Sequence, residues 1–320
     1  MANKLAAKKS TPKRASKASA KVPALPQRKC GCMSVHYWLL EQYPEYRAAQ
    51  SILEHSVFAS RRMAKTAPTK PSIINVVVHV LESPGAGKVT AAQVDAQIKV
   101  LNEDYRAKNL DKSNVPAVWQ GMVADAMIQF QLATKDPNGN KADGLVYVPT
   151  IEPIFGQNDS MKDPARGGSA AWPTDRYLNI WVCPLKDGLL GYAQFPGGPP
   201  TTDGVVISLN AFGIGGTAQR PFDKGRTCTH EIGHYFNLRH IWGDTPDCSG
   251  GDSVDDTPNA EGPNYNTPTF PKVSCQNGPN GEMFMNYMDY VNDEAMFMFT
   301  PQQVSRMRTT LDGPRMSLWS

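Results

Sequence analysis

The chain has 320 residues, of which 40% are hydrophobic and 20% are charged, and its formal net charge at pH 7 is +3. This length is sufficient for one large domain or two smaller domains with a hydrophobic core. No stretch approaches 18 consecutive apolar residues, so the sequence predicts no transmembrane helix.

The N-terminal 29 residues form a basic arm, because they contain nine lysines and arginines and no acidic residue. We expect residues 1–29 to be disordered. A basic arm can bind nucleic acid or an anionic membrane. This one lacks interleaved aromatic residues and the rest of the chain is net acidic, which favours a solvated tail without a nucleic-acid partner. No apolar run of signal-peptide length follows the charged start.

Residues 30–62 form a second segment, which is predicted to be helical from residue 33 and ends in the basic pair Arg61–Arg62. A linker rich in alanine, threonine, lysine and proline follows at residues 63–71, so we expect the main domain to comprise residues 72–320. That domain opens with the β-branched run Ile73–Leu81, which is typical of a buried strand.

The main domain mixes predicted helices and strands. Thr90–Arg106 has apolar residues at helical spacing, with Thr90 as N-cap and Gln93 completing a capping box. Alternation, β-branched runs and flanking glycines predict four more strands, at Met127–Ala133, Tyr177–Val182, Gly204–Leu209 and, as a short edge strand, Gly191–Phe195. The rest is predicted as a helix at Asp223–Leu238, irregular structure at Gly243–Met285 and a helix at Pro301–Leu311.

The segment HEIGHYFNLRH carries the chemistry. His230 and His234 are four residues apart on a predicted helix, so their imidazoles lie on one face and can bind one metal ion. Neutral imidazole suits zinc, and catalytic zinc sites use three protein ligands and a water molecule. Glu231 adjoins the first ligand and can reach that water as a general base.

His240 is the candidate third ligand. A continuous helix would turn it away, so the chain must turn near Asn237, and asparagine adopts the left-handed conformation more readily than other residues except glycine. The pattern His-Glu-x-x-His also occurs by chance in helices, but here three of the six histidines fall within eleven residues. His36, His55 and His79 show no ligand spacing.

This motif resembles the metzincin signature, with Asn237 in place of a glycine. Asn286–Tyr290 (NYMDY) resembles the Met-turn of the same clan, with Met288 beneath the metal site. Over about residues 72–311 the chain is most similar to the pappalysin family, particularly its small microbial members. The other segments that carry this likeness are DRYLNIWV at Asp175–Val182, LLGYAQFPGG at Leu189–Gly198 and GDSVDDTP at Gly251–Pro258.

The resemblance implies a metzincin catalytic domain of the α/β class. Its upper lobe would hold a twisted mixed sheet, a backing helix and the zinc helix, and its irregular lower lobe the Met-turn and the C-terminal helix. It implies a secreted zinc-dependent endopeptidase, made as a latent zymogen, that acts on protein or peptide substrates. The alternative is a catalytically silent zinc-stabilised binding module, against which the presence of Glu231 argues.

The resemblance also implies roles for single residues. Tyr290 would hydrogen-bond the oxyanion of the reaction. Cys248 and Cys275 correspond to a family disulfide, whereas Thr267 and Ala295 stand where the cysteines of a second disulfide would be. The residues that correspond to a calcium-binding loop, for which a solvated acidic loop is the alternative, are Asp252, Asp255, Asp256 and Thr257.

The last two predictions concern the latency of the enzyme and its substrate specificity. Arg28–Cys32 (RKCGC) resembles a cysteine switch, in which Cys30 would occupy the metal's open position, with ordinary free thiols as the alternative. Glu294 would correspond to the acid at the base of the pocket for the residue after the scissile bond. We therefore expect cleavage before arginine, less well before lysine, and self-processing at Ser60–Arg61. The alternative is that Glu294 is a surface acid and Arg61–Arg62 a site for another protease.

Overall fold

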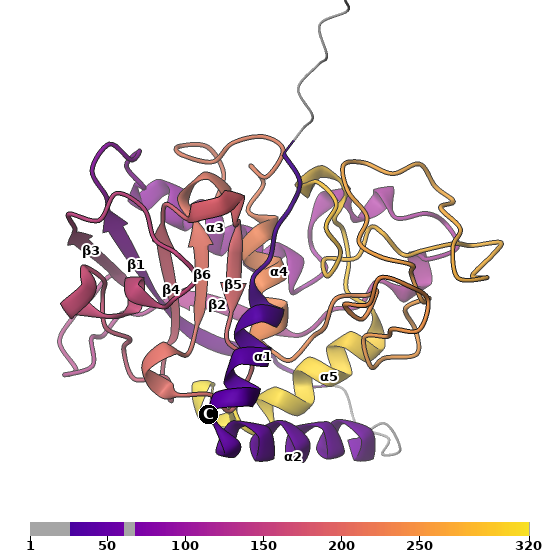
Figure 1. Ribbon diagram of the computed structural model, residues 1–320, viewed down its shortest axis with the longest axis horizontal. Helices are drawn as coiled ribbons and strands as arrows, with labels where there is room; N and C mark the ends of the chain where they lie inside the picture. Colours follow the sequence, from indigo (N-terminus) through magenta and orange to yellow (C-terminus); the bar gives the residue numbers. More distant parts are fainter. Residues whose placement is uncertain (1–25, 61–67, 320) are drawn as a thin grey trace, which may run out of the picture.

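A mixed six-stranded sheet organises the part of the chain that this computed structural model describes, residues 26–60 and 68–319 (Figure 1). The strands are β1 Ser72–Glu82, β2 Ile128–Leu132, β3 Leu145–Pro149, β4 Leu178–Cys183, β5 Gly191–Ala193 and β6 Val205–Ser208. Their order is β2-β1-β4-β6-β5, with β3 also paired to β1, and only β5 runs antiparallel to its neighbour. The α/β class is thus as predicted.

The apolar, β-branched sequence of β1 suits its central position in the sheet. It pairs in parallel with β2, β3 and β4, so most of its side chains are buried on both faces, as its β-branched run predicts. The edge strand β5 is also as predicted, although it is only three residues long. Strand β3 was not predicted, because its side chains are half-buried or exposed and show no clear alternation.

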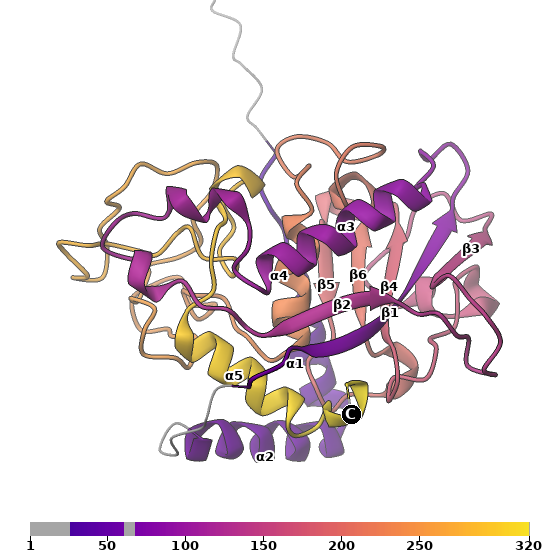
Figure 2. The same ribbon diagram turned by 180° about the vertical axis from the view of Figure 1, so that it is seen from behind.

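Two helices pack against the sheet. Helix α3, Ala91–Asp104, crosses it (Figure 2), and α4, Arg226–Tyr235, packs against β5 and β6. The Thr90 side chain accepts a hydrogen bond from the Gln93 backbone, as predicted. The predicted capping box is wrong in its second half, because the Gln93 side chain donates to Phe212 and Thr217 instead.

The predicted helix of residues 33–62 is two helices, α1 Cys32–Gln42 and α2 Pro44–Ser60. Tyr43 between them is extended, because proline disfavours the helical conformation of the residue before it. Helix α1 packs beside β5, and α2 lies under the C-terminal helix α5, Pro301–Leu311, in both ribbon views. The basic pair and residues 63–67 of the predicted linker lie outside the described residues.

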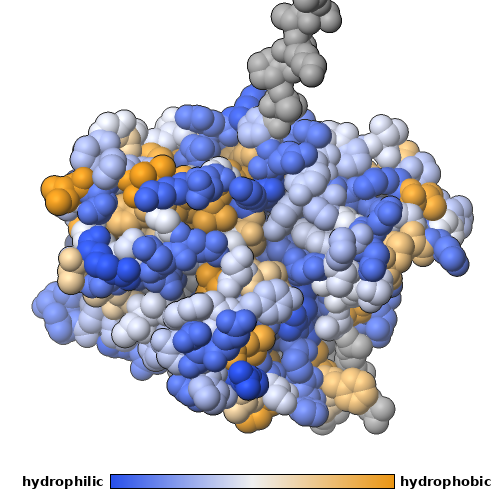
Figure 3. Space-filling view, in the orientation of Figure 1, coloured by the Kyte–Doolittle hydropathy of each residue, from blue (hydrophilic) through white to orange (hydrophobic). Residues whose placement is uncertain are grey.

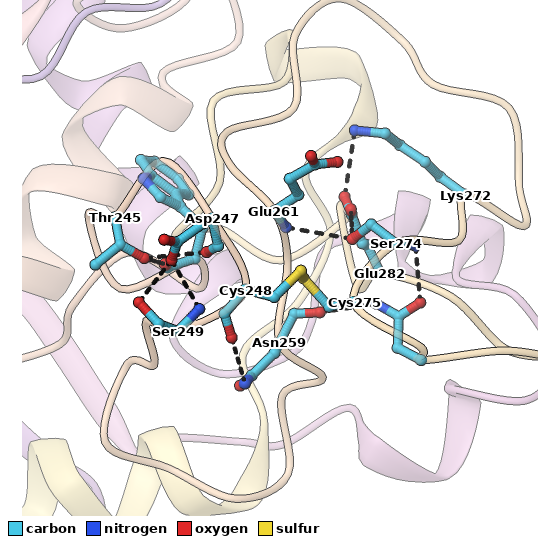
Figure 4. The surroundings of a disulfide bond; sticks show 12 residues. Thr245, Asp247, Cys248, Ser249, Asn259, Glu261, Lys272, Ser274, Cys275 and Glu282 are labelled. Atoms are coloured by element: carbon cyan, nitrogen blue, oxygen red, sulfur yellow. Dashed lines mark hydrogen bonds and ion pairs between the residues drawn. A yellow bond between two sulfur atoms is a disulfide. The ribbon is translucent and has the colours of Figure 1, made fainter.

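The region Gly243–Met285 has no helix or strand, as predicted, and it is fixed by other means. Cys248 and Cys275 form the disulfide that the resemblance implies (Figure 4). Beside it, Asp247 accepts hydrogen bonds from both the backbone and the hydroxyl of Ser249. Covalent and side-chain links therefore replace regular backbone pairing in this lobe.

The surface seen in Figure 3 is mostly hydrophilic, with hydrophobic residues in a few separate patches. Among the described residues, no helix has the length and apolar composition needed to span a bilayer.

Candidate metal centre and active site

The end of helix α4 gives the motif its shape. Asn237 has a φ of 71°, the left-handed conformation predicted for it. The Asn237 backbone N–H donates to His234 O at 2.8 Å, and that of Leu238 donates to Gly233 O at 2.9 Å. This pair of hydrogen bonds is a Schellman motif, which ends the helix and reverses the chain. The reversal brings His240 back beside His230 and His234.

The three imidazoles converge through their Nε2 atoms. The His230–His234, His234–His240 and His230–His240 Nε2 pairs are 3.2, 3.0 and 3.3 Å apart. A tetrahedral zinc ion with ordinary zinc–nitrogen bonds would separate two nitrogens by about 3.3 Å. The donor set present in the chain therefore fits this ion.

The outer ring nitrogens are fixed as well. His230 Nδ1 donates to Tyr287 O, and His234 Nδ1 donates to Leu238 O, at 2.7 and 2.8 Å. His240 Nδ1 lies 2.6 Å from Asp244 Oδ1. With the proton at Nδ1, each Nε2 presents its lone pair to the centre, as metal-ligating histidines do. Burial also lowers the pKa of His230 to about 3, which keeps that ring neutral.

Met288 lies directly against the motif helix. Its side chain is fully buried, and a Cβ atom on Gly233 would lie only 2.5 Å from its Sδ. Glycine at position 233 therefore admits the methionine. Because Tyr287 O also accepts from His230, the turn 286–290 touches both the helix and a candidate ligand.

Glu231 is buried next to the convergent histidines. A Cβ atom on Gly191 of β5 would lie 3.0 Å from its Oε1, so the edge strand passes close to the carboxylate. Cys30 Sγ and Cys32 Sγ both lie within reach of Glu231 Oε2, at 3.3 and 2.9 Å. Burial raises the pKa of Glu231 well above its usual range.

The segment Lys29–Gly31 lies along β5 in front of this site. Leu190 N donates to Lys29 O and Gly31 N donates to Gly191 O, both at 3.0 Å, so the segment adds to the edge of the sheet in parallel. Cys30 Sγ and the three Nε2 atoms all lie within 4.8 Å of one another. The Tyr290 hydroxyl is 3.5 Å from Cys30 O, on the same side of the site. The structure thus brings Cys30, Glu231 and Tyr290 to the histidines.

Arg28 corrects the expected extent of the arm. It was predicted to be disordered, but its side chain is buried, with 2% exposed, and donates to Thr227 Oγ1, Val291 O and Asp293 Oδ1. The Asp293 contact is a 2.6 Å ion pair, and the guanidinium lies over the Phe222 ring. Residues 1–25 of the arm lie outside the described residues.

Glu294 does not lie at the base of a pocket, so that prediction is wrong. It is exposed and accepts a hydrogen bond from Thr267. The neighbouring Asp293 is fully buried and holds Arg28, and its other oxygen accepts from the backbone of Lys224 and Arg226. Sequence analysis missed Asp293, whose only signal was its place one residue before Glu294.

Two carboxylates of the acidic loop 252–257 accept hydrogen bonds from other groups of the protein. Asp252 accepts from the Thr257 hydroxyl, and Asp256 accepts from Thr300 Oγ1 and Gln302 N at the start of α5. Within residues 26–60 and 68–319, the groups of three or more imidazole, thiol or carboxylate ligands close enough for one metal ion both include Cys30 and His234, at the histidine site. This geometry adds no support for a calcium site.

Comparisons with known proteins agree on one family. A peptidase M43 family model, described as pregnancy-associated plasma protein-A, matches residues 166–312. An extracellular metalloprotease of Arthroderma gypseum is 30% identical over 292 residues, which cover 88% of this chain and 83% of the relative.

Two solved structures are similar in both sequence and fold. Mature mirolysin of Tannerella forsythia, in complex with a cleaved peptide, is 48% identical with a TM-score of 0.77, covering 79% of this chain and 97% of that one. A promirolysin mutant from the same organism is 43% identical with a TM-score of 0.84, covering 91% and 97%.

Proposed function

This chain belongs to the pappalysin family of metalloendopeptidases, and from that membership we propose that it is a zinc enzyme held latent by its own N-terminal segment. The ligands are His230, His234 and His240. The observation that carries this assignment is the convergence of their three Nε2 atoms while every Nδ1 is bonded to an outer oxygen. Within the motif, Glu231 is the remaining ionisable side chain buried at the same point.

The proposed reaction is hydrolysis of a peptide bond. Zinc, when bound, supplies a Lewis acid for the scissile carbonyl and the attacking water. Glu231 accepts the proton of that water and passes it to the leaving amine. A carboxyl group whose pKa is raised by burial suits both steps, because it holds the proton more readily than an exposed one. The Tyr290 hydroxyl donates a hydrogen bond to the oxyanion.

Latency arises because residues 28–32 occupy the site. Cys30 takes the position open to water and substrate, and the backbone of Lys29–Gly31 uses the edge of β5 that an extended substrate would need. Cys32 adds a contact that the sequence did not suggest. Its thiol donates to Glu231 and accepts from Ala193 N at 2.9 Å, so the base is engaged as well as the metal.

The proposed specificity is for arginine after the scissile bond. Arg28 stands in for such a residue, because its guanidinium fills a buried pocket with Asp293 at the base and Phe222 at the side. A planar guanidinium makes several directed contacts there, whereas lysine could make fewer. We therefore transfer the specificity role from Glu294 to Asp293. Self-processing at Ser60–Arg61 stays a prediction, since Arg61 lies outside the described residues.

Secretion and calcium are separate proposals. The relatives are named extracellular, and the Cys248–Cys275 disulfide is typical of an oxidising compartment, so we propose that this chain is exported. Calcium binding by the 252–257 loop stays a prediction.

Incubation of the purified chain, after removal of its N-terminal segment, with a mixture of unfolded proteins tests the proposed function. Mass spectrometry of the products should show cuts before arginine that stop when zinc is chelated and resume when zinc is restored. A silent zinc-stabilised binding module would bind zinc and leave the mixture intact.

A further inference from the structure

Helix α2 binds the body of the protein through one continuous face. Its buried residues recur at helical spacing, which places them on one stripe: Tyr46, Gln50, Leu53, Val57 and Ser60. The opposite face is exposed and includes Ile52 and Phe58. We name the surface under the stripe the α2 seat, and its residues are Pro196, Gly197, Asn237, Arg239, Arg306 and Thr309.

A partly buried ion pair, next to the stripe, anchors α2 in the α2 seat. The side chain of Arg306 is 1% exposed and that of Glu54 is 34% exposed, and both guanidinium ends of Arg306 contact the Glu54 carboxylate. Arg306 Nε also donates to Asn237 O at 2.6 Å, and the Asn237 side chain donates to Glu54 at 3.3 Å. Withdrawal of α2 would break both charge-assisted contacts between Glu54 and Arg306 at once.

Further contacts extend along the helix on both sides of Glu54. Gln50 Nε2 donates to Pro196 O at 2.6 Å, and a hydrogen bond of 3.0 Å joins Thr309 to Ser60, the last described residue of α2. Gly197 lies so close that a Cβ atom there would be 2.7 Å from that of Ala49. The α2 seat therefore contacts the helix over its length.

None of these contacts depends on the peptide link beyond Ser60. That link keeps α2 at high effective concentration, but the binding energy comes from residues before it. The contacts of Arg28 with Asp293, and of Cys30 and Cys32 with Glu231, belong to the same segment. A cut after Ser60 would thus leave a fragment held at two places, the histidine site and the α2 seat.

We propose that the α2 seat is a binding surface for a separate polypeptide, residues 1–60 after the chain is cut, and that this fragment stays bound as an inhibitor. The proposal rests on the role of residues 30–62 as a pro-segment. The α2 seat would bind an amphipathic helix that carries one carboxylate beside its apolar stripe. That carboxylate pairs with Arg306. Activity then follows dissociation or a second cut within the segment.

The test uses the full chain, made inactive by Glu231→Gln, with residues 62–67 replaced by the recognition sequence of a site-specific protease. After cutting, the two pieces should co-elute in size-exclusion chromatography. Glu54→Gln in this chain should raise the dissociation rate of the fragment at least about 10-fold, through loss of a charge-assisted contact. Glu45→Gln, an exposed acid on the same helix, should leave the rate unchanged.

Glu54→Asp keeps the charge and should retain the fragment better than Glu54→Gln, which separates the ion pair from general damage to α2. Separation of the pieces in the parent, or equal dissociation rates for the Glu54→Gln and Glu45→Gln chains, would overturn the proposal. The cutting protease is external and the chain inactive, so the outcome is independent of whether the proposed peptidase activity is correct.

Discussion

The three candidate ligands differ in what holds their outer nitrogen. His230 and His234 use backbone carbonyls, whereas His240 uses the side chain of Asp244. Burial opposes a charge on His240, but Asp244 outweighs it and raises the pKa of His240 to about 9. Asp244 therefore makes that imidazole a more basic donor and fixes its orientation.

Asp244→Asn should lower zinc affinity by about 10- to 100-fold, because the amide keeps the shape of the side chain without its charge. Competition with a chromophoric chelator measures the change directly. Asp247→Asn, which alters an exposed acid of the same loop, should bind zinc as the parent does. Equal affinities for the two variants would show that Asp244 does not support the metal site.

Asp293→Asn should reduce kcat/KM for peptides with arginine after the scissile bond by about 10- to 100-fold, through loss of a charge-assisted contact. Peptides with leucine at that place should be affected much less. Asparagine keeps an oxygen for the backbone donors of Lys224 and Arg226, which protects the fold. Glu294→Gln is the matched control, and loss of arginine preference in that variant instead would restore the original assignment.

The sequence was sufficient to predict the residues of the proposed metal motif but not the acid that we propose for specificity. Spacing along a helix and one turn-forming asparagine were enough to predict the convergence of His230, His234 and His240. Asp293 and Glu294 lie in a single 3-10 turn, Asp293–Ala295, where adjacent side chains point in different directions. Only the partner of each side chain distinguishes them, and the partner of Asp293 is 265 residues away.

At the scale of elements, α4 can pack closely on the turn 286–290 because position 233 is a glycine and has no side chain. Gly233→Ala should lower the free energy of unfolding by about 1–3 kcal/mol, because the new methyl group would collide with Met288. Chemical denaturation of the metal-loaded chain measures it. Gly262→Ala, at a site with no atom within 4 Å of the added carbon, should be close to neutral. A Gly233→Ala chain as stable as the control would contradict the close contact.

The N-terminal segment carries two thiols with different contacts. Both contact Glu231, but Cys30 also lies with the three histidines, whereas Cys32 contacts the backbone of β5. Cys30→Ala should therefore speed the appearance of a product that begins at Arg61 more than Cys32→Ala does. A time course of processing, read by N-terminal sequencing, compares them. Processing at the parental rate in the Cys30→Ala chain would count against the switch.

Elements with strong local signals were predicted well and those set by distant contacts were not. The β-branched run was enough to predict β1, and the proline at position 301 was enough to predict the start of α5. The Gln93 side chain left its capping box because Phe212 and Thr217, far along the chain, offer it partners. Proline at position 44 was a local signal for the break between α1 and α2 that the sequence analysis did not use.

For the whole molecule, the sequence implied a catalytic body preceded by a latency segment but not how the segment is held. Arg28 pairs with Asp293, and Glu54 pairs with Arg306, across 265 and 252 residues. Local sequence patterns cannot predict such pairs, because each partner looks like an ordinary charged residue in an exposed segment. They make the N-terminal segment part of the folded structure.

The central claim is that three histidines hold a zinc ion for which Glu231 serves as the base, and one comparison tests it most directly. Parent and Glu231→Gln chains, both with residues 62–67 replaced by the recognition sequence of the same external protease, are cut and freed of the N-terminal fragment. They are then assayed for zinc content and for cleavage of an arginine-containing peptide. The account predicts one zinc ion in each and activity at least about 100-fold lower in the variant. Parental activity in the variant, or an active parent without zinc, would contradict it.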